Sequence, residues 1–140
     1  MTHIPRTLLA ACTALALVTP ALAAGDATKG ENEFKKCRSC HSITKPDGTD
    51  VVKGGKIGPN LYGVIGRTAG STDFAYSDLM KEAGTKGLVW DEAELVPYLA
   101  DPAAFLRGKA SEATGSSKMS FKLAKGGEDI AAYLASVAQK

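Results

Sequence analysis

The sequence predicts an all-α protein, in which four to five short helices and long loops wrap around a group that the side chains do not supply. Three observations carry this prediction. The helical patterns are short, and loops rich in glycine and proline separate them. The last pattern, residues 128–138, has an apolar stripe formed by Ile130, Tyr133, Leu134 and Val137 that needs a partner. A cysteine motif over residues 37–41 indicates that this group is bound covalently.

The first helix is expected to begin after Asp26, whose side chain suits an N-cap. Helical spacing then places Ala27, Gly30, Phe34 and Cys37 on one face. Because glycine is costly inside a helix, we expect another helix to approach Gly30 closely.

Further elements follow along the chain. Residues 51–52 suit a short strand, although no partner strand is visible, and residues 107–125 read as loop. We expect four further helices. The first covers 73–83 and is ended by Gly84, and the second runs from the cap Asp91 to about residue 100. The third runs from Pro102 through Leu106, and the fourth covers 128–138. Pro97 lies inside the second of these helices, where it removes a backbone hydrogen bond and predicts a kink.

The N-terminal segment has a character of its own. A short stretch with one positive charge precedes an almost wholly apolar run, and small residues follow it. This order is typical of a secretory signal peptide, and the apolar run is too short to span a membrane. We therefore predict a cleaved signal over 1–23, with cleavage after Ala23 or Ala24, and one exported domain over 24–140. A permanent N-terminal anchor is the alternative.

Charge narrows the function classes. The chain has 17 basic and 15 acidic residues, a net charge of +2, which gives no basis for binding nucleic acid. Basic residues gather in 29–56 and 118–125, whereas 57–101 is acidic overall. A fold that joins the two basic segments has a positive face and a negative back. Lipidation at Cys12 is disfavoured because apolar sequence continues after it.

The segment Cys37-Arg38-Ser39-Cys40-His41 is the C-x-x-C-H pattern of covalent haem attachment. The two thiols add across the porphyrin vinyl groups, and His41 becomes the proximal iron ligand. The motif occurs once, so we predict one haem c. A thioredoxin-like dithiol lacks its βαβ context, a zinc site lacks four ligands, and a plain disulfide leaves the histidine unexplained.

The sixth iron position has two methionine candidates in the mature chain. Met80 lies in a helical stretch, where packing is the simpler interpretation. Met119 is a lone apolar side chain in a polar loop, and reaching the iron gives it a reason. Thioether ligation closes the site and raises the reduction potential. Lys118 is a minor third option, and an open position suits gas binding or peroxide chemistry instead.

Taken together, these motifs resemble the class I cytochromes c, most closely the bacterial cytochrome c2 group. The resemblance covers essentially all of 24–140 and implies the class I fold around one covalent haem. The motifs that carry it are Gly25-Asp26, Lys29-Gly30, Phe34, the C-x-x-C-H segment, Gly58-Pro59-Asn60-Leu61-Tyr62-Gly63, Gly66-Arg67-Thr68-Ala69-Gly70, Trp90, Tyr98-Leu99, Asp101-Pro102, Lys118-Met119-Ser120-Phe121 and Ala132-Tyr133-Leu134.

The resemblance also implies residue roles. Ordinary core packing of Trp90, Tyr98 and Phe105 is compatible with these roles, and Ser117 also suits an exposed loop. The implied roles are thioether attachment by Cys37 and Cys40, axial ligation by His41 and Met119, a hydrogen bond from His41 to the Pro59 carbonyl, propionate contacts by Arg67, Tyr76 and Trp90, placement of Tyr98 and Ser117 beside Met119, and packing of Gly30 and Phe34 on Ile130 and Tyr133. The loops over 45–56 and 108–117 are longer than in mitochondrial cytochrome c, and Pro97 is not expected in the family.

The implied function is a soluble, monomeric periplasmic electron carrier, not an enzyme, without a membrane anchor or a nucleic-acid partner. It takes electrons from a cytochrome bc1 complex to a photosynthetic reaction centre or a terminal oxidase. The expected docking lysines, each also explained as a solvated side chain, are Lys35, Lys36, Lys53, Lys56, Lys118, Lys122 and Lys125. The alternatives are a small haem peroxidase or gas sensor, and a subunit that works only in a larger complex.

Overall fold

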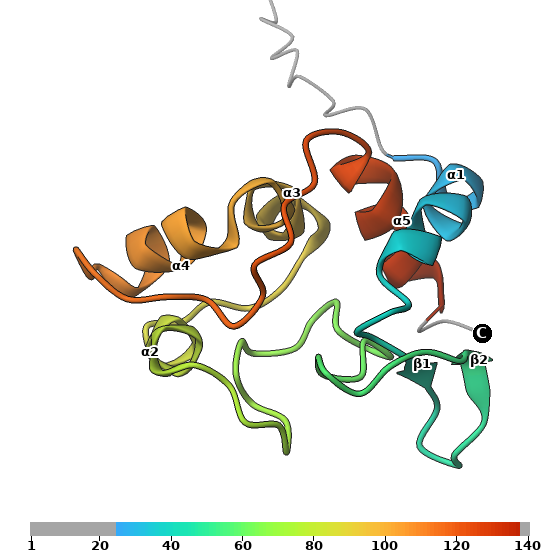
Figure 1. The fold of residues 1–140 in the computed structure, drawn as a ribbon, viewed down its shortest axis with the longest axis horizontal. Coiled ribbons are helices and arrows are strands. Elements are labelled where there is room, and N and C mark those ends of the chain that lie inside the picture. The colour runs from blue at the N-terminus through green and yellow to red at the C-terminus, as the bar shows by residue number, and fades with distance from the viewer. Residues whose placement is uncertain (1–24, 138–140) are drawn as a thin grey trace, which may run out of the picture.

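A computed structural model describes residues 25–137 (Figure 1), so the predicted signal segment lies outside the described residues. The elements of the described chain are α1 (Ala27–Glu33), a 3-10 turn (Phe34–Lys36), β1 (Ile43–Thr44), β2 (Asp50–Val52), α2 (Asp78–Thr85), α3 (Glu92–Ala100), α4 (Pro102–Ala110) and α5 (Gly127–Val137). No helix among these residues is long and apolar enough to cross a membrane.

Helices α1 and α5 lie side by side and join the two ends of the described chain (Figure 1). The Asp26 carboxylate caps α1 by accepting the N–H groups of Thr28 at 2.9 Å and Lys29 at 3.1 Å. The N–H group of Asp26 donates to the Asp129 carboxylate on α5 at 2.7 Å. A Cβ on Gly30 would lie only 1.9 Å from the Asp129 carbonyl oxygen, which confirms the predicted close approach of another helix.

Two further aspartates cap the N-termini of α3 and α4. Asp91 begins α3 by accepting the N–H of Glu94 at 2.6 Å, and Asp101 begins α4 by accepting the N–H of Ala104 at 3.1 Å. Pro97 lies within α3, which nevertheless continues to Ala100. Both caps were predicted from the sequence and are confirmed.

Two predicted helix boundaries are wrong, and so is the expectation that the strand over 51–52 has no partner. Helix α2 begins at Asp78 rather than at residue 73, because the Ser77 hydroxyl caps it by accepting the Met80 N–H at 3.3 Å. Helix α4 continues into the predicted loop and ends at Ala110, where Ser111 takes a positive φ of 55°. Residues 51–52 do have a partner, because β2 pairs antiparallel with β1.

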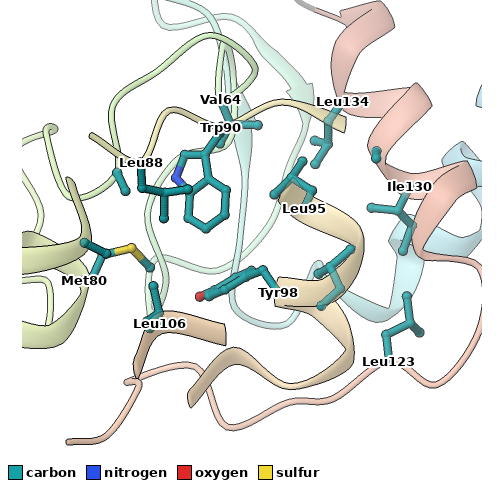
Figure 2. Close-up of a cluster of buried hydrophobic side chains, with 14 of the residues drawn as sticks. Val64, Met80, Leu88, Trp90, Leu95, Tyr98, Leu106, Leu123, Ile130 and Leu134 are labelled. Atoms are coloured by element: carbon teal, nitrogen blue, oxygen red, sulfur yellow. The ribbon is translucent and has the colours of Figure 1, made fainter. Parts of the chain in front are cut away.

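A buried cluster between α2, α3, α4 and α5 surrounds the centre of the molecule (Figure 2). Trp90 lies at its middle, with its ring 4.8 Å from that of Tyr98 and stacked on Phe105 at 6.0 Å. Leu106 and Ile130 are fully buried at the edges of the cluster. These side chains leave a cavity among them, which is lined by the residues of the candidate site.

Candidate haem-binding site

A single tight turn brings the cysteine motif to the cavity. The N–H groups of Cys40 and His41 both donate to the Cys37 carbonyl, at 3.1 Å and 2.9 Å. Side chains three and four residues apart then share one face. All three line a cavity of about 280 Å³. The structure therefore presents two free thiols and one imidazole to the same internal space.

The His41 ring is held in one orientation. Its Nδ1–H donates to the Pro59 carbonyl oxygen at 2.7 Å, and because a carbonyl only accepts, the Nε2 atom carries no proton. Burial lowers the pKa of His41, so the imidazole stays neutral. Gly58 lies on the ring, since a Cβ there would be 2.3 Å from His41 Cε1. The result is a neutral, fixed nitrogen ligand of the kind that binds iron.

The thiols are suited to forming covalent bonds with an apolar group rather than to binding a bare metal ion as thiolates. Burial raises the pKa of Cys37 to about 11, which keeps its thiol protonated in the folded chain. The Cys40 sulfur lies 3.7 Å from the Ser39 hydroxyl. Among residues 25–137 no cluster of three or more His, Cys, Asp or Glu side chains could hold a bare metal ion.

The loop after α4 supplies Met119 to the cavity. The Met119 N–H donates to the Ser117 hydroxyl at 3.1 Å. Burial raises the pKa of Tyr98, and the Ser117 hydroxyl beside the phenol offsets part of this effect. The structure therefore places Tyr98 and Ser117 next to the Met119 segment. The Lys118 ammonium instead donates to the Ala75 carbonyl oxygen, which is not the arrangement of an iron ligand.

Arg67, Tyr76 and Trp90 also line the cavity. The half-buried Arg67 guanidinium donates to the carbonyl oxygens of Asn60 at 3.1 Å and Tyr62 at 2.9 Å, and burial lowers its pKa. None of the ion pairs among residues 25–137 involves Arg67. A half-buried cation without a carboxylate partner fits an anionic group of a bound molecule.

The donor set of the cavity matches a covalently bound haem. It contains two thiols at the spacing of the attachment motif, a neutral imidazole with a free nitrogen, thioether sulfur and an unpaired guanidinium. The remaining lining is largely aliphatic and aromatic, as a porphyrin ring requires.

The comparisons with known proteins agree with this geometry. No protein-family model matches the chain. It is 57% identical over 125 residues to cytochrome c2 of Rhodobacter capsulatus, which covers 89% of this chain and 90% of that protein. It is 55% identical over 118 residues to cytochrome c-551 of Roseobacter denitrificans, covering 84% and 85% of the two chains. The solved structure of the R. capsulatus protein matches with a TM-score of 0.79 over 81% of this chain and 98% of that chain.

This chain belongs to the cytochrome c2 group of class I cytochromes c. The predicted all-α class I fold and the single covalently attached haem c are thereby confirmed. As a member of this group, the cytochrome is an electron carrier and not an enzyme.

The seven predicted docking lysines differ in their distance from the cavity and in their ion pairs. Lys36 and Lys118 line the cavity, whereas the other five predicted docking lysines do not. Lys36 forms an ion pair with Glu33, and Lys122 pairs with Asp101 at 2.6 Å. Lys35 donates to the Asn32 side chain at 3.1 Å. Of the seven predicted docking lysines, those with no ion pair among the described residues are Lys35, Lys53, Lys56, Lys118 and Lys125.

Sequence reasoning missed several residues of the site. Ile57 and Phe121 line the cavity of the cytochrome yet are 77% and 43% exposed, so they lie at its mouth. Gly58 carries the His41 ring, and Met80 lines the same cavity as Met119. The glycine-proline pair indicated only a loop, and Met80 was a candidate iron ligand whose helical setting favoured packing.

Proposed function

We propose that this cytochrome is a soluble periplasmic carrier that takes one electron from a cytochrome bc1 complex and delivers it to a photosynthetic reaction centre or a terminal oxidase. The observation that carries the proposal is the ligand set of the cavity, where a fixed neutral imidazole and a thioether face the same space. The predicted cleavable segment over 1–23, followed by one domain over 24–140, supports export.

Within this proposal each residue of the cavity has a task. The bound haem supplies an iron that changes between ferric and ferrous states. Cys37 and Cys40 would hold the haem through thioethers, and His41 and Met119 would ligate its iron. Pro59 orients the His41 ring, Arg67, Tyr76 and Trp90 receive the propionates, and Tyr98 and Ser117 support the Met119 segment.

The protein then has to keep the site unchanged as the electron enters and leaves. The hydrogen bond from His41 to Pro59 fixes one ligand in both oxidation states. The buried Trp90 and Tyr98 rings exclude water from the interior. Ile57 and Phe121 leave an apolar mouth through which a partner protein approaches.

Absorption spectra of the purified holoprotein test the proposal. A ferric sulfur-to-iron charge-transfer band, together with a ferrous form that does not bind carbon monoxide, is the expected result. Ready binding of carbon monoxide and no sulfur band would show an open sixth position. The carrier proposal would then be wrong, and gas sensing or peroxide chemistry would replace it.

Docking through lysine is expected to depend on position and salt. Lys56 is exposed, precedes Ile57 at the cavity mouth and has no ion pair among the described residues. Lys56→Gln should lower the association rate with an acidic redox partner roughly severalfold at low ionic strength. The difference should vanish near 1 M salt, where the Debye length is about 3 Å.

Stopped-flow electron transfer across a salt series measures this effect. Lys45→Gln, in the turn between β1 and β2, removes the same charge from a residue that, unlike Lys56, is not adjacent in sequence to any residue lining the cavity. It should leave the rate near that of the parent. Equal losses in the two variants would mean that total charge, and not a docking face, sets the rate.

A further inference from the structure

Two methionines from different parts of the fold line the haem cavity. Met119 comes from the loop after α4, and Met80 comes from the first turn of α2. Met80 is 8% exposed, so its thioether belongs to the interior. Leucine would fill that space about as well, but only the thioether adds a soft sulfur that binds iron.

Tyr98 lies near Met80 and near the segment that carries Met119. Figure 2 shows the Met80 side chain extending from α2 into the cluster, toward Leu106 and the hydroxyl end of Tyr98. The same phenol lies beside the Ser117 hydroxyl, which accepts the Met119 N–H at 3.1 Å. Tyr98 therefore lies between Met80 and the Met119 segment, and both methionines line the same cavity.

The Met119 loop also rests directly on α2. Gly115 packs on Leu79, the residue before Met80, so closely that a Cβ on the glycine would lie 3.3 Å from Leu79 Cδ1. The Lys118 ammonium donates to the Ala75 carbonyl, two residues before the cap of α2. The loop and the first turn of α2 thus form one contiguous wall.

The two methionines differ in how firmly the backbone holds them. Residues 111–116 are exposed and have no helix or strand, so no backbone ladder holds the loop that carries Met119 in place. The Met80 backbone is fixed within a helix, where its N–H donates to the Ser77 cap. Its long unbranched side chain retains rotational freedom. If the loop opens, Met119 leaves and Met80 stays.

We propose that Met80 is a reserve axial ligand, whose sulfur takes the sixth iron position when Met119 is displaced. One iron–sulfur coordination bond breaks and another forms, and no electron or proton is exchanged. The exchange keeps the iron closed to peroxide and other small ligands while the loop is open. This inference rests on the proposed ligation by Met119.

Three variants of the holoprotein test the proposal: Met119→Ala, Met80→Leu and the double variant. Met80→Leu conserves volume and should keep the parent spectrum, while thermal unfolding checks that all three fold. Met119→Ala should retain a ferric sulfur-to-iron band, and the double variant should lose it. With carbon monoxide as the probe, the ferrous double variant should bind at least about tenfold faster than Met119→Ala.

Two outcomes would overturn the reserve ligand and are distinguishable from each other. If Met119→Ala and the double variant both lack the band and bind carbon monoxide equally, Met80 does not reach the iron, and ligation by Met119 stands. If Met80→Leu alone abolishes the band, Met80 is the resident ligand and the assignment of Met119 fails as well. Neither outcome bears on the spectrum of the parent, which tests the carrier function separately.

Discussion

Gly30→Ala is expected to destabilise the cytochrome by at least about 3 kcal/mol, the upper end of the range for overpacked cores. The new Cβ would meet the Asp129 carbonyl oxygen at 1.9 Å and Tyr133 Cβ at 2.8 Å. The oxygen belongs to the backbone of α5, so the clash is relieved only if α1 and α5 move apart. Separation would also weaken the contact between the Phe34 and Tyr133 rings, now 5.6 Å apart.

The measurement is thermal or guanidinium unfolding followed by circular dichroism, with an expected drop in melting temperature on the order of 10 °C. Gly108→Ala is the matched control, because Gly108 is also helical, yet nothing lies within 4 Å of its added Cβ. The control should gain up to about 1 kcal/mol from helix propensity alone. Equal stability of the two variants would show that close approach is not what requires glycine at residue 30.

The features of the fold that the sequence predicted well share a local cause. Asp26, Asp91 and Asp101 cap helices through bonds to N–H groups two or three residues away, so a short stretch of sequence contains the whole interaction. The last helix shows its apolar stripe for the same reason. Its packing partner, α1, could be placed only through the family resemblance.

Features that depend on distant partners were missed. Strand β1 has two residues, too few to display alternation, and it exists because β2 pairs with it. The start of α2 is an exception, because the Ser77 hydroxyl that caps it is as local as the aspartate caps, whereas the sequence predicted a start at residue 73. Helix α4 continues to Ala110 because Leu106 and Ala110 are buried on its inner face, a tertiary effect that overrides the polar composition.

For the site, the proposed ligands were easier to find in the sequence than the residues that support them. The attachment motif and Met119 are visible because they depart from ordinary sequence patterns. Gly58 has no such signal, since its role is to leave room for a ring that folding brings against it. Met80 was a candidate ligand in the sequence, where its helical setting favoured packing, and the structure adds that it lines the cavity.

Gly58→Ala should alter the haem site itself. The added Cβ would lie 2.3 Å from Cε1 of His41 and 2.7 Å from both ring nitrogens. The backbone cannot retreat freely, because the Gly58 N–H donates to the Cys40 carbonyl at 2.8 Å and Pro59 follows at once. The ring must therefore turn, which breaks or lengthens its 2.7 Å hydrogen bond to the Pro59 carbonyl.

That bond makes the imidazole a stronger donor and so favours ferric iron. Its loss should raise the reduction potential of the cytochrome, and the overpacking should lower stability by about 2 kcal/mol. Potentiometric titration followed at the haem absorption bands measures the first effect, and thermal unfolding measures the second.

Gly63→Ala separates the effect on the ring from ordinary backbone strain. Gly63 lies in the same loop with φ of +66°, and nothing lies within 4 Å of an added Cβ. Alanine there should cost about 1 to 2 kcal/mol because it must adopt a left-handed conformation. Since it touches neither His41 nor Pro59, the reduction potential should not move. A shift of the potential in both variants would mean that it follows general loosening of the loop. A shift confined to Gly58→Ala would instead trace the potential to the hydrogen bond between His41 and Pro59, and with it the identity of His41 as a ligand.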